Sequence, residues 1–82
     1  MKATVLVRPK AGILDPQGKA VLTGLGHLGF SGVRTAHVGR LVELELDETD
    51  PAKARALIAA MCDQLIANPL IESYEIELEG DA

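Results

Sequence analysis

The sequence predicts a single α+β domain spanning residues 1–82, a two-layer sandwich with elements in the order βαββαβ. Three observations support this prediction. Three segments alternate apolar and polar residues as strands do, and Val33–Val38 is a further predicted strand. Two segments between the strands carry apolar residues at helical spacing, and each of those two begins with Asp-Pro. Hydrophobic residues make up 48% of the chain, which is enough for a packed core and too much for a disordered segment.

The first predicted strand covers Lys2 to Arg8. Ala3, Val5 and Val7 alternate with charged and neutral residues, which indicates a strand with one buried face. Pro9 ends the pattern because proline has no N–H for a sheet hydrogen bond. Residues 10–14 then form a loop.

The first predicted helix begins at Asp15-Pro16. Aspartate is a favoured N-cap, and proline at the first helical position loses no hydrogen bond. We expect the Asp15 carboxylate to accept the N–H of Gln17 or Gly18. The apolar stripe of this helix is Val21, Leu25 and Leu28, and Gly29 ends it.

Two further strands are predicted in the middle of the chain, at Val33–Val38 and Leu41–Leu46. Ser31-Gly32 is a turn before them. Gly39-Arg40 separates the two strands and predicts a tight hairpin connection.

The second predicted helix begins at Asp50-Pro51, which repeats the Asp-Pro start, and ends at Asn68-Pro69. The last strand follows, with Tyr74, Ile76 and Leu78 alternating with glutamates. The apolar stripe of the helix consists of Ala54, Leu57, Ile58, Met61 and Leu65.

This order of elements predicts a ferredoxin-like sandwich, an antiparallel four-stranded sheet with both helices on one face. The other face is then open, and Lys2 and Arg8 of a central first strand lie between two rows of glutamates. Because edge strands left unpaired favour association, we expect the protein to form homo-oligomers.

The distribution of charged residues along the sequence indicates which kind of macromolecule the protein binds. The net charge is −4, but residues 1–40 carry six basic side chains against Asp15 alone, while residues 41–82 carry eleven acidic side chains against two basic ones. Such a polarised domain favours protein partners or further copies of itself. Nucleic acid is disfavoured, since Phe30 and Tyr74 are the only aromatic residues and no basic patch is concentrated.

No apolar run approaches the roughly 20 residues that a membrane span needs, and no secretory signal is evident. A single cysteine, Cys62, fits the reducing cytosol. We therefore expect a cytoplasmic protein that binds no membrane.

The stretch GILDPQGK resembles a phosphate-binding loop only superficially. Five residues, rather than four, separate Gly12 from Gly18, and Ala20 stands where a hydroxyl is required. A helix start explains the stretch better. Gly18, Gly24 and Gly26 then predict close approach by another backbone, either that of the sheet or that of a neighbouring chain.

We find no candidate catalytic or metal-ligating group. Cys62 has no partner base in any recognisable motif, and we expect it to be a buried, inert thiol. His27 and His37 lack the spacing of metal ligands. The sequence therefore predicts no catalytic residue, no metal site and no cofactor bound by this chain.

Three segments in order, LDPQGKAV, VGRLVELEL and ANPLIESYEIEL, resemble the small subunit of phosphoribosylformylglycinamidine synthase, an amidotransferase of purine biosynthesis. The resemblance runs from the first strand to Leu78. It implies a complex in which a glutaminase subunit frees ammonia from glutamine and a large synthetase subunit, using ATP and magnesium, amidates formylglycinamide ribonucleotide. The small subunit is then a non-catalytic assembly subunit, at least dimeric, that bridges the two larger ones and supports ammonia transfer.

The resemblance also implies roles for residues at matching positions. Asp15, Pro16 and Gly18 form the helix-start motif, and His37 stands where a basic residue is more usual. A structural role remains open for each position, with Asn68 as a helix stop and Tyr74 in the core. The expected partner-contact residues are Gln17, Lys19, Arg40, Asn68, Glu72 and Tyr74.

An alternative function is an ACT-like regulatory module that binds a small molecule. That fold uses the same βαββαβ order, and Gly12 follows the first strand as such a module would require.

Overall fold

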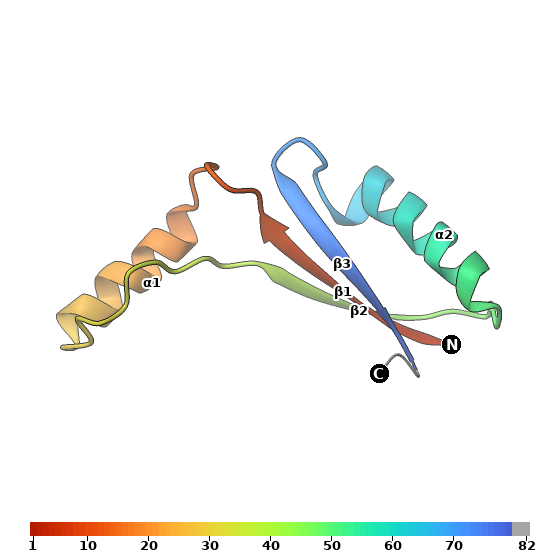
Figure 1. Ribbon diagram of the computed structural model, residues 1–82, viewed down its shortest axis with the longest axis horizontal. Coiled ribbons are helices and arrows are strands. Elements are labelled where there is room, and N and C mark those ends of the chain that lie inside the picture. The colour runs from red at the N-terminus through yellow and green to blue at the C-terminus, as the bar shows by residue number, and fades with distance from the viewer. Residues whose placement is uncertain (80–82) are drawn as a thin grey trace.

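The computed structural model describes residues 1–79, and Figure 1 shows its arrangement. Three strands, β1, β2 and β3, form one antiparallel sheet, helix α2 packs on it, and helix α1 projects from one end. The elements in chain order are β1 (Lys2–Pro9), α1 (Pro16–His27), β2 (Arg40–Glu45), α2 (Pro51–Met61), the π-helical turn η1 (Cys62–Ile66) and β3 (Glu72–Leu78).

The first strand is central, as predicted, in the order β2-β1-β3. Thr4 lies opposite Glu43 of β2 and Glu77 of β3. The predicted cross-strand charge pattern is confirmed at Arg8, whose Nη1 lies 2.9 Å from Oε1 of Glu75. The face away from α2 is therefore an exposed, glutamate-rich surface.

The core lies between the sheet and α2. Ala3, Val5 and Val7 of β1 are buried against a helical row formed by Ala54, Ile58 and Cys62. The row follows the i, i+4, i+8 spacing that places residues on one helical face.

The predicted apolar stripe of α2 was therefore only partly correct. Ala54 and Ile58 face the sheet, but Leu57, Met61 and Leu65 are 46%, 37% and 87% exposed. In the last turn the helix widens into η1, where the N–H of Ala67 donates to the carbonyl oxygen of Cys62 at 2.9 Å.

Both Asp-Pro helix starts are confirmed. The Asp15 carboxylate accepts the N–H of Gly18 at 2.9 Å, and that of Asp50 accepts the N–H of Ala52 at 3.0 Å. Each pairing satisfies one of the backbone donors that a helix N-terminus leaves free.

The prediction of close backbone approach is confirmed for Gly18, where a Cβ would overlap the carbonyl oxygen of Ala36. At Gly24 and Gly26 the sheet does not approach, because a Cβ added there would meet nothing of the described chain within 4 Å. Approach by a neighbouring chain at these two glycines stays a prediction.

The predicted four-stranded sheet is not found in the described residues, which contain three strands. Residues 33–38 are extended but form no sheet ladder, and the expected hairpin at Gly39-Arg40 is replaced by a chain that continues into β2 (Figure 1). The path is straight because Arg40 already pairs with Val7 as the first residue of β2.

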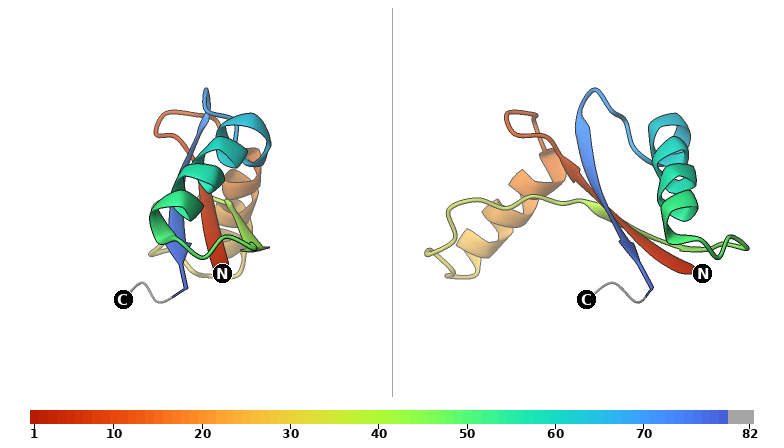
Figure 2. Two further views of the ribbon diagram at one scale, coloured as in Figure 1. Left: turned by 90° about the vertical axis from the view of Figure 1, so that its right-hand side faces the viewer. Right: turned by 45° about the vertical axis from the view of Figure 1, so that its right-hand side comes forward.

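The prediction that both helices cover one face of the sheet is also wrong for this chain. Residues 10–39, which we call the arm, carry α1 away from α2, and Figure 2 shows the same separation from two further directions. The radius of gyration is 15.9 Å, whereas a compact chain of this length has about 12 Å. In α1 only Gly18 is buried, while Val21 and Leu28 of the predicted stripe are 45% and 73% exposed.

Candidate partner-contact site

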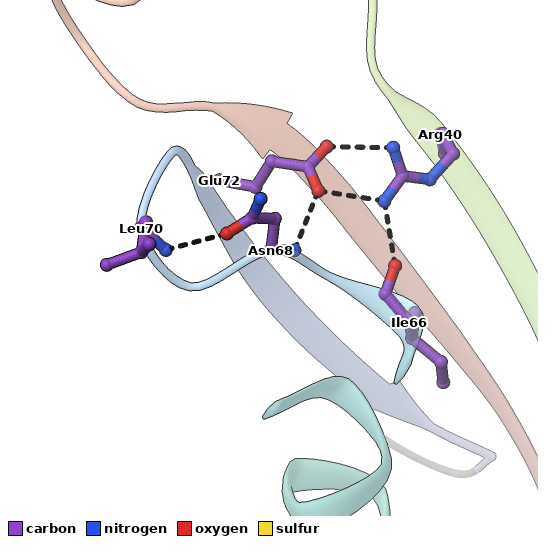
Figure 3. A network of polar contacts seen from close by, with 5 residues as sticks. All are labelled: Arg40, Ile66, Asn68, Leu70 and Glu72. Carbon is purple, nitrogen blue, oxygen red and sulfur yellow. Dashed lines mark hydrogen bonds and ion pairs between the residues drawn. The ribbon is translucent and has the colours of Figure 1, made fainter. Parts of the chain in front are cut away.

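The expected contact residues fall into three places. Gln17 and Lys19 lie in the first turns of α1, and Tyr74 lies on β3. Arg40, Asn68 and Glu72 come from three separate segments and meet at the end of the sheet where the arm joins it (Figure 3).

The Arg40 guanidinium is the centre of this junction. It donates from Nη1 to Glu72 Oε2 at 2.8 Å and from Nη2 to Glu72 Oε1 at 3.0 Å, a bidentate pairing. A further bond of 2.7 Å joins Nη2 to the carbonyl oxygen of Ile66, at the end of η1 (Figure 3). The planar fork of arginine suits this geometry, which lysine could not reproduce.

Asn68 completes the junction from the loop before β3. Its N–H donates to Glu72 Oε1 at 2.8 Å, and its Oδ1 accepts the N–H of Leu70 at 3.1 Å. Its carbonyl oxygen also accepts the N–H of Glu72 at 2.7 Å. The loop is therefore held in one shape by its own asparagine, as an Asx turn.

The pairing changes the acidity of both charged groups. Hydrogen bonds from Arg40 and the N–H of Asn68 lower the pKa of Glu72 below its usual 4.5. The Glu72 carboxylate in turn raises the pKa of Arg40. Both groups are charged at neutral pH, and the Glu72 side chain is only 17% exposed.

Asp15 links α1 to the segment beside it. Besides capping Gly18, its carboxylate accepts the N–H of Val38 at 2.8 Å, and Nδ1 of His37 lies 3.7 Å from it. The two backbone hydrogen bonds, from Gly18 and Val38, lower the pKa of Asp15. Asp15 therefore fixes α1 against residues 36–38.

Tyr74 makes a side-chain contact within the body of the protein. Its hydroxyl lies 3.3 Å from Oδ1 of Asp63 in η1. Burial, and next the negative charge of Asp63, raise the pKa of Tyr74. The side chain is half-buried over the core, in line with the structural role that the sequence left open.

Gln17 and Lys19 are exposed, and within residues 1–79 their side chains form no hydrogen bond or ion pair. Lys19 borders a hollow of about 240 Å³ between α1 and residues 34–37. Arg34 and His37 line the same hollow, together with Leu14 and Leu22. Lys19 and Arg34, beside these apolar side chains, can contact an acidic protein surface.

The chemistry available in this part of the chain is limited. Among residues 1–79, no three histidine, cysteine or acidic side chains gather where they could hold a metal ion. Burial raises the pKa of the Cys62 thiol, so the thiol stays neutral near pH 7. No helix in the same range has the length and apolar character needed to cross a bilayer.

Sequence reasoning named Arg40, Asn68 and Glu72 but not their mutual contact. It also missed Ile66 and Val38, which contribute only backbone groups, and Asp63 as the partner of Tyr74. No pattern in the sequence marks such contacts, because they join residues far apart in the chain.

Comparison with known proteins gives a consistent result. Residues 2–80 match the family model PurS, described as phosphoribosylformylglycinamidine (FGAM) synthase. The PurS subunit of this synthase from Synechocystis is 45% identical over 74 residues, covering 90% of this chain and 72% of that relative.

Solved structures of PurS subunits share the fold. The crystal structure of Methanocaldococcus jannaschii PurS matches with a TM-score of 0.84 at 33% identity, covering 99% of this chain and 98% of that one. A chain in the structure of PurLQS from Thermotoga maritima matches with a TM-score of 0.83 at 25% identity, covering 93% of each chain. The ACT-like alternative gains no support from these comparisons.

Proposed function

This chain belongs to the PurS family, and we propose that it is a non-catalytic assembly subunit of phosphoribosylformylglycinamidine synthase in purine biosynthesis. The family match over residues 2–80 is the observation that carries the proposal. In this role the chain bridges the large synthetase subunit and the glutaminase subunit and supports transfer of ammonia between them. The complex uses ATP and magnesium, and this chain binds no cofactor. It acts in the cytoplasm.

The PurLQS structure from Thermotoga maritima contains a chain of this fold, which supports an assembly role. The shape of the molecule supports it as well, since an extended arm offers contact surface on more than one side. Two of the expected contact residues, Gln17 and Lys19, present exposed polar groups on α1 to a partner. Arg40, Asn68 and Glu72 act chiefly by fixing the junction from which the arm projects.

Self-association is a further part of the proposal, as a homodimer or a dimer of dimers. Leu28 and Phe30 at the tip of the arm are 73% and 59% exposed. The outer edge of β2 is also unpaired within residues 1–79. Apolar side chains and a free sheet edge in one small protein favour contact with another copy.

Reconstitution tests the proposal. The synthetase and glutaminase subunits from the same organism are mixed with and without this chain, and amidation is measured with glutamine or with ammonium as nitrogen source. We expect glutamine-dependent activity to require the chain and ammonium-dependent activity to be independent of it. Full glutamine-dependent activity without the chain would refute the assembly role.

A charge-reversal pair tests the contact surface. Lys19→Glu should weaken co-purification with the larger subunits about tenfold, because it places a like charge against an acidic partner. Lys53→Glu, at an exposed position of α2, is the matched control and should leave co-purification unchanged. Equal affinity for both variants would exclude Lys19 from the interface.

A further inference from the structure

Two loops are joined at the end of the sheet where the arm begins. The first loop follows β1 and covers residues 10–14, and the second, residues 68–71, precedes β3. The N–H of Lys10 donates to the carbonyl oxygen of Ile71 at 2.8 Å, and Nζ of Lys10 donates to that of Pro69 at 2.6 Å. These two hydrogen bonds hold the loops next to each other.

The paired loops expose four large apolar side chains, which we call the apolar loop surface: Ile13, Leu14, Leu70 and Ile71. Leu14 and Leu70 are the most open of the four, at 78% and 83% exposed. Figure 3 shows the side chain of Leu70 pointing away from Arg40 and Glu72. Single exposed apolar residues are ordinary on a protein, but a group of them is typical of a site that contacts another molecule.

The backbone that carries Leu70 is held in one shape although its side chain is open. Asn68 accepts the N–H of Leu70 on Oδ1 at 3.1 Å, and its carbonyl oxygen accepts the N–H groups of Ile71 and Glu72 at 3.1 and 2.7 Å. Because this loop is ordered before any contact forms, binding through Leu70 loses little conformational entropy.

A hollow of about 210 Å³ adjoins the apolar loop surface. Every residue of that surface except Leu70 lines it, together with Gln17, Arg40 and Glu72, three of the expected contact residues. The charged groups there are already paired, since Arg40 pairs with Glu72 and the Asp15 carboxylate accepts two backbone N–H groups. Small-molecule sites usually enclose about 300 Å³ or more, so this hollow suits an apolar side chain of a protein instead.

Lys10 supplies a positive charge beside the same surface. Within residues 1–79 its ammonium group forms no ion pair, and its bond to the carbonyl oxygen of Pro69 leaves the charge uncompensated. A carboxylate on the partner is therefore favoured next to Lys10.

We propose that the apolar loop surface is where a larger subunit of the complex docks. Leu70 enters an apolar pocket of that subunit, an apolar side chain of the subunit fills the hollow, and one of its carboxylates faces Lys10. The inference rests on the proposed function and names the surface that holds the partner. Leu28 and Phe30 lie at the far end of α1, so contact with a second copy there leaves this surface accessible (Figure 1).

Titration in the reconstituted complex tests the surface. This chain is added in increasing amounts to fixed synthetase and glutaminase subunits, and the concentration that gives half of the maximal glutamine-dependent rate is measured. Leu70→Ala should raise that concentration about tenfold, because most of the apolar area buried in the contact is removed. Leu70→Met, which conserves volume, should stay within about twofold of wild type. Leu41→Ala, at a 56% exposed position of β2, is the matched control and should leave the concentration unchanged.

The charge is tested in the same titration. Lys10→Gln keeps a donor for the carbonyl oxygen of Pro69 and removes the charge, so it should raise the half-maximal concentration about threefold. A Leu70→Ala chain equal to wild type would refute docking at this surface while the stimulation by wild type upholds the proposed function. A wild-type chain that gives no stimulation would refute the proposed function and this inference together.

Light scattering separates docking from self-association. Leu70→Ala should have the same mass as wild type, since the proposed occupant is a larger subunit. A smaller mass for this variant would show that a second copy of the chain occupies the surface, which would overturn the inference.

Cross-linking identifies the occupant directly. Cys62 is buried, so a photoactivated maleimide reacts with the exposed thiol of a Leu70→Cys chain. After mixing with both larger subunits and illumination, we expect a covalent product with a larger subunit, whereas the same label on Leu41→Cys should give none. A product of two copies of this chain, or no product with either larger subunit, would refute docking through Leu70.

Discussion

Replacing Glu72 with alanine should destabilise the protein by about 1.5–2 kcal/mol. The substitution removes the bidentate partner of Arg40 and the acceptor for the N–H of Asn68. The Arg40 side chain is 50% exposed, so the ion pair contributes about 0.5–1 kcal/mol. The hydrogen bond from the N–H of Asn68 adds about 1 kcal/mol, because that donor is left without its acceptor.

Glu75→Ala is the matched control on the same strand. Glu75 accepts one hydrogen bond from Arg8, and the two side chains are 60% and 56% exposed. We expect a loss of at most about 0.5 kcal/mol. Both losses are measured by urea unfolding followed by circular dichroism, at equal chain concentration because self-association would couple to stability. Equal losses for the two variants would show that the junction stabilises the fold no more than an exposed pair.

The pH dependence of stability tests the contact between Glu72 and Arg40 a second time. The pKa of Glu72 is lowered in the folded state from its usual 4.5, so its contribution is present above that value and is lost as pH falls through the folded pKa. The stability difference between wild type and Glu72→Ala should therefore shrink below about pH 4.5. A difference that stays constant down to pH 2 would show that the ionised carboxylate is not responsible.

Three further outcomes follow from the packing. Ile58→Ala should cost about 3 kcal/mol of unfolding free energy, since the side chain is fully buried, while Leu70→Ala, 83% exposed, should cost about 0.5 kcal/mol or less. Gly18→Ala should lower the melting temperature, because the added methyl group would overlap the backbone beside α1. Gly26→Ala has room for a methyl group and should raise the free energy of unfolding by up to about 1 kcal/mol. Equal shifts in melting temperature for the two variants would contradict the packing of α1. Burial raises the pKa of Cys62 above its usual 9.0, so its thiol stabilises the fold below that pH and loses the effect as pH rises through the folded pKa. The stability difference between wild type and Cys62→Ala should therefore change above pH 9.0 in alkaline urea titrations and remain flat below it.

The candidate site was foreseen residue by residue but not as a unit. Arg40, Asn68 and Glu72 were named through the family resemblance, and the structure brings them together at one junction. Gln17 and Lys19 remain predictions, since partner contact is not visible in a single chain. Tyr74 contacts Asp63 of its own chain, which alternation along a strand could not indicate.

The sequence by itself determined the local elements. Strict alternation placed β1 and β3, and Asp-Pro placed the starts of both helices, because a strand face or a helix cap depends on residues a few positions apart. It did not determine the path at Gly39, since a hairpin and a continuous strand share the same alternation on either side of that residue. Only the tertiary structure decided it, through Arg40, which is held by Glu72 and Ile66 from parts of the chain more than twenty residues away. On this path α1 lies away from α2, and the sheet within residues 1–79 has three strands.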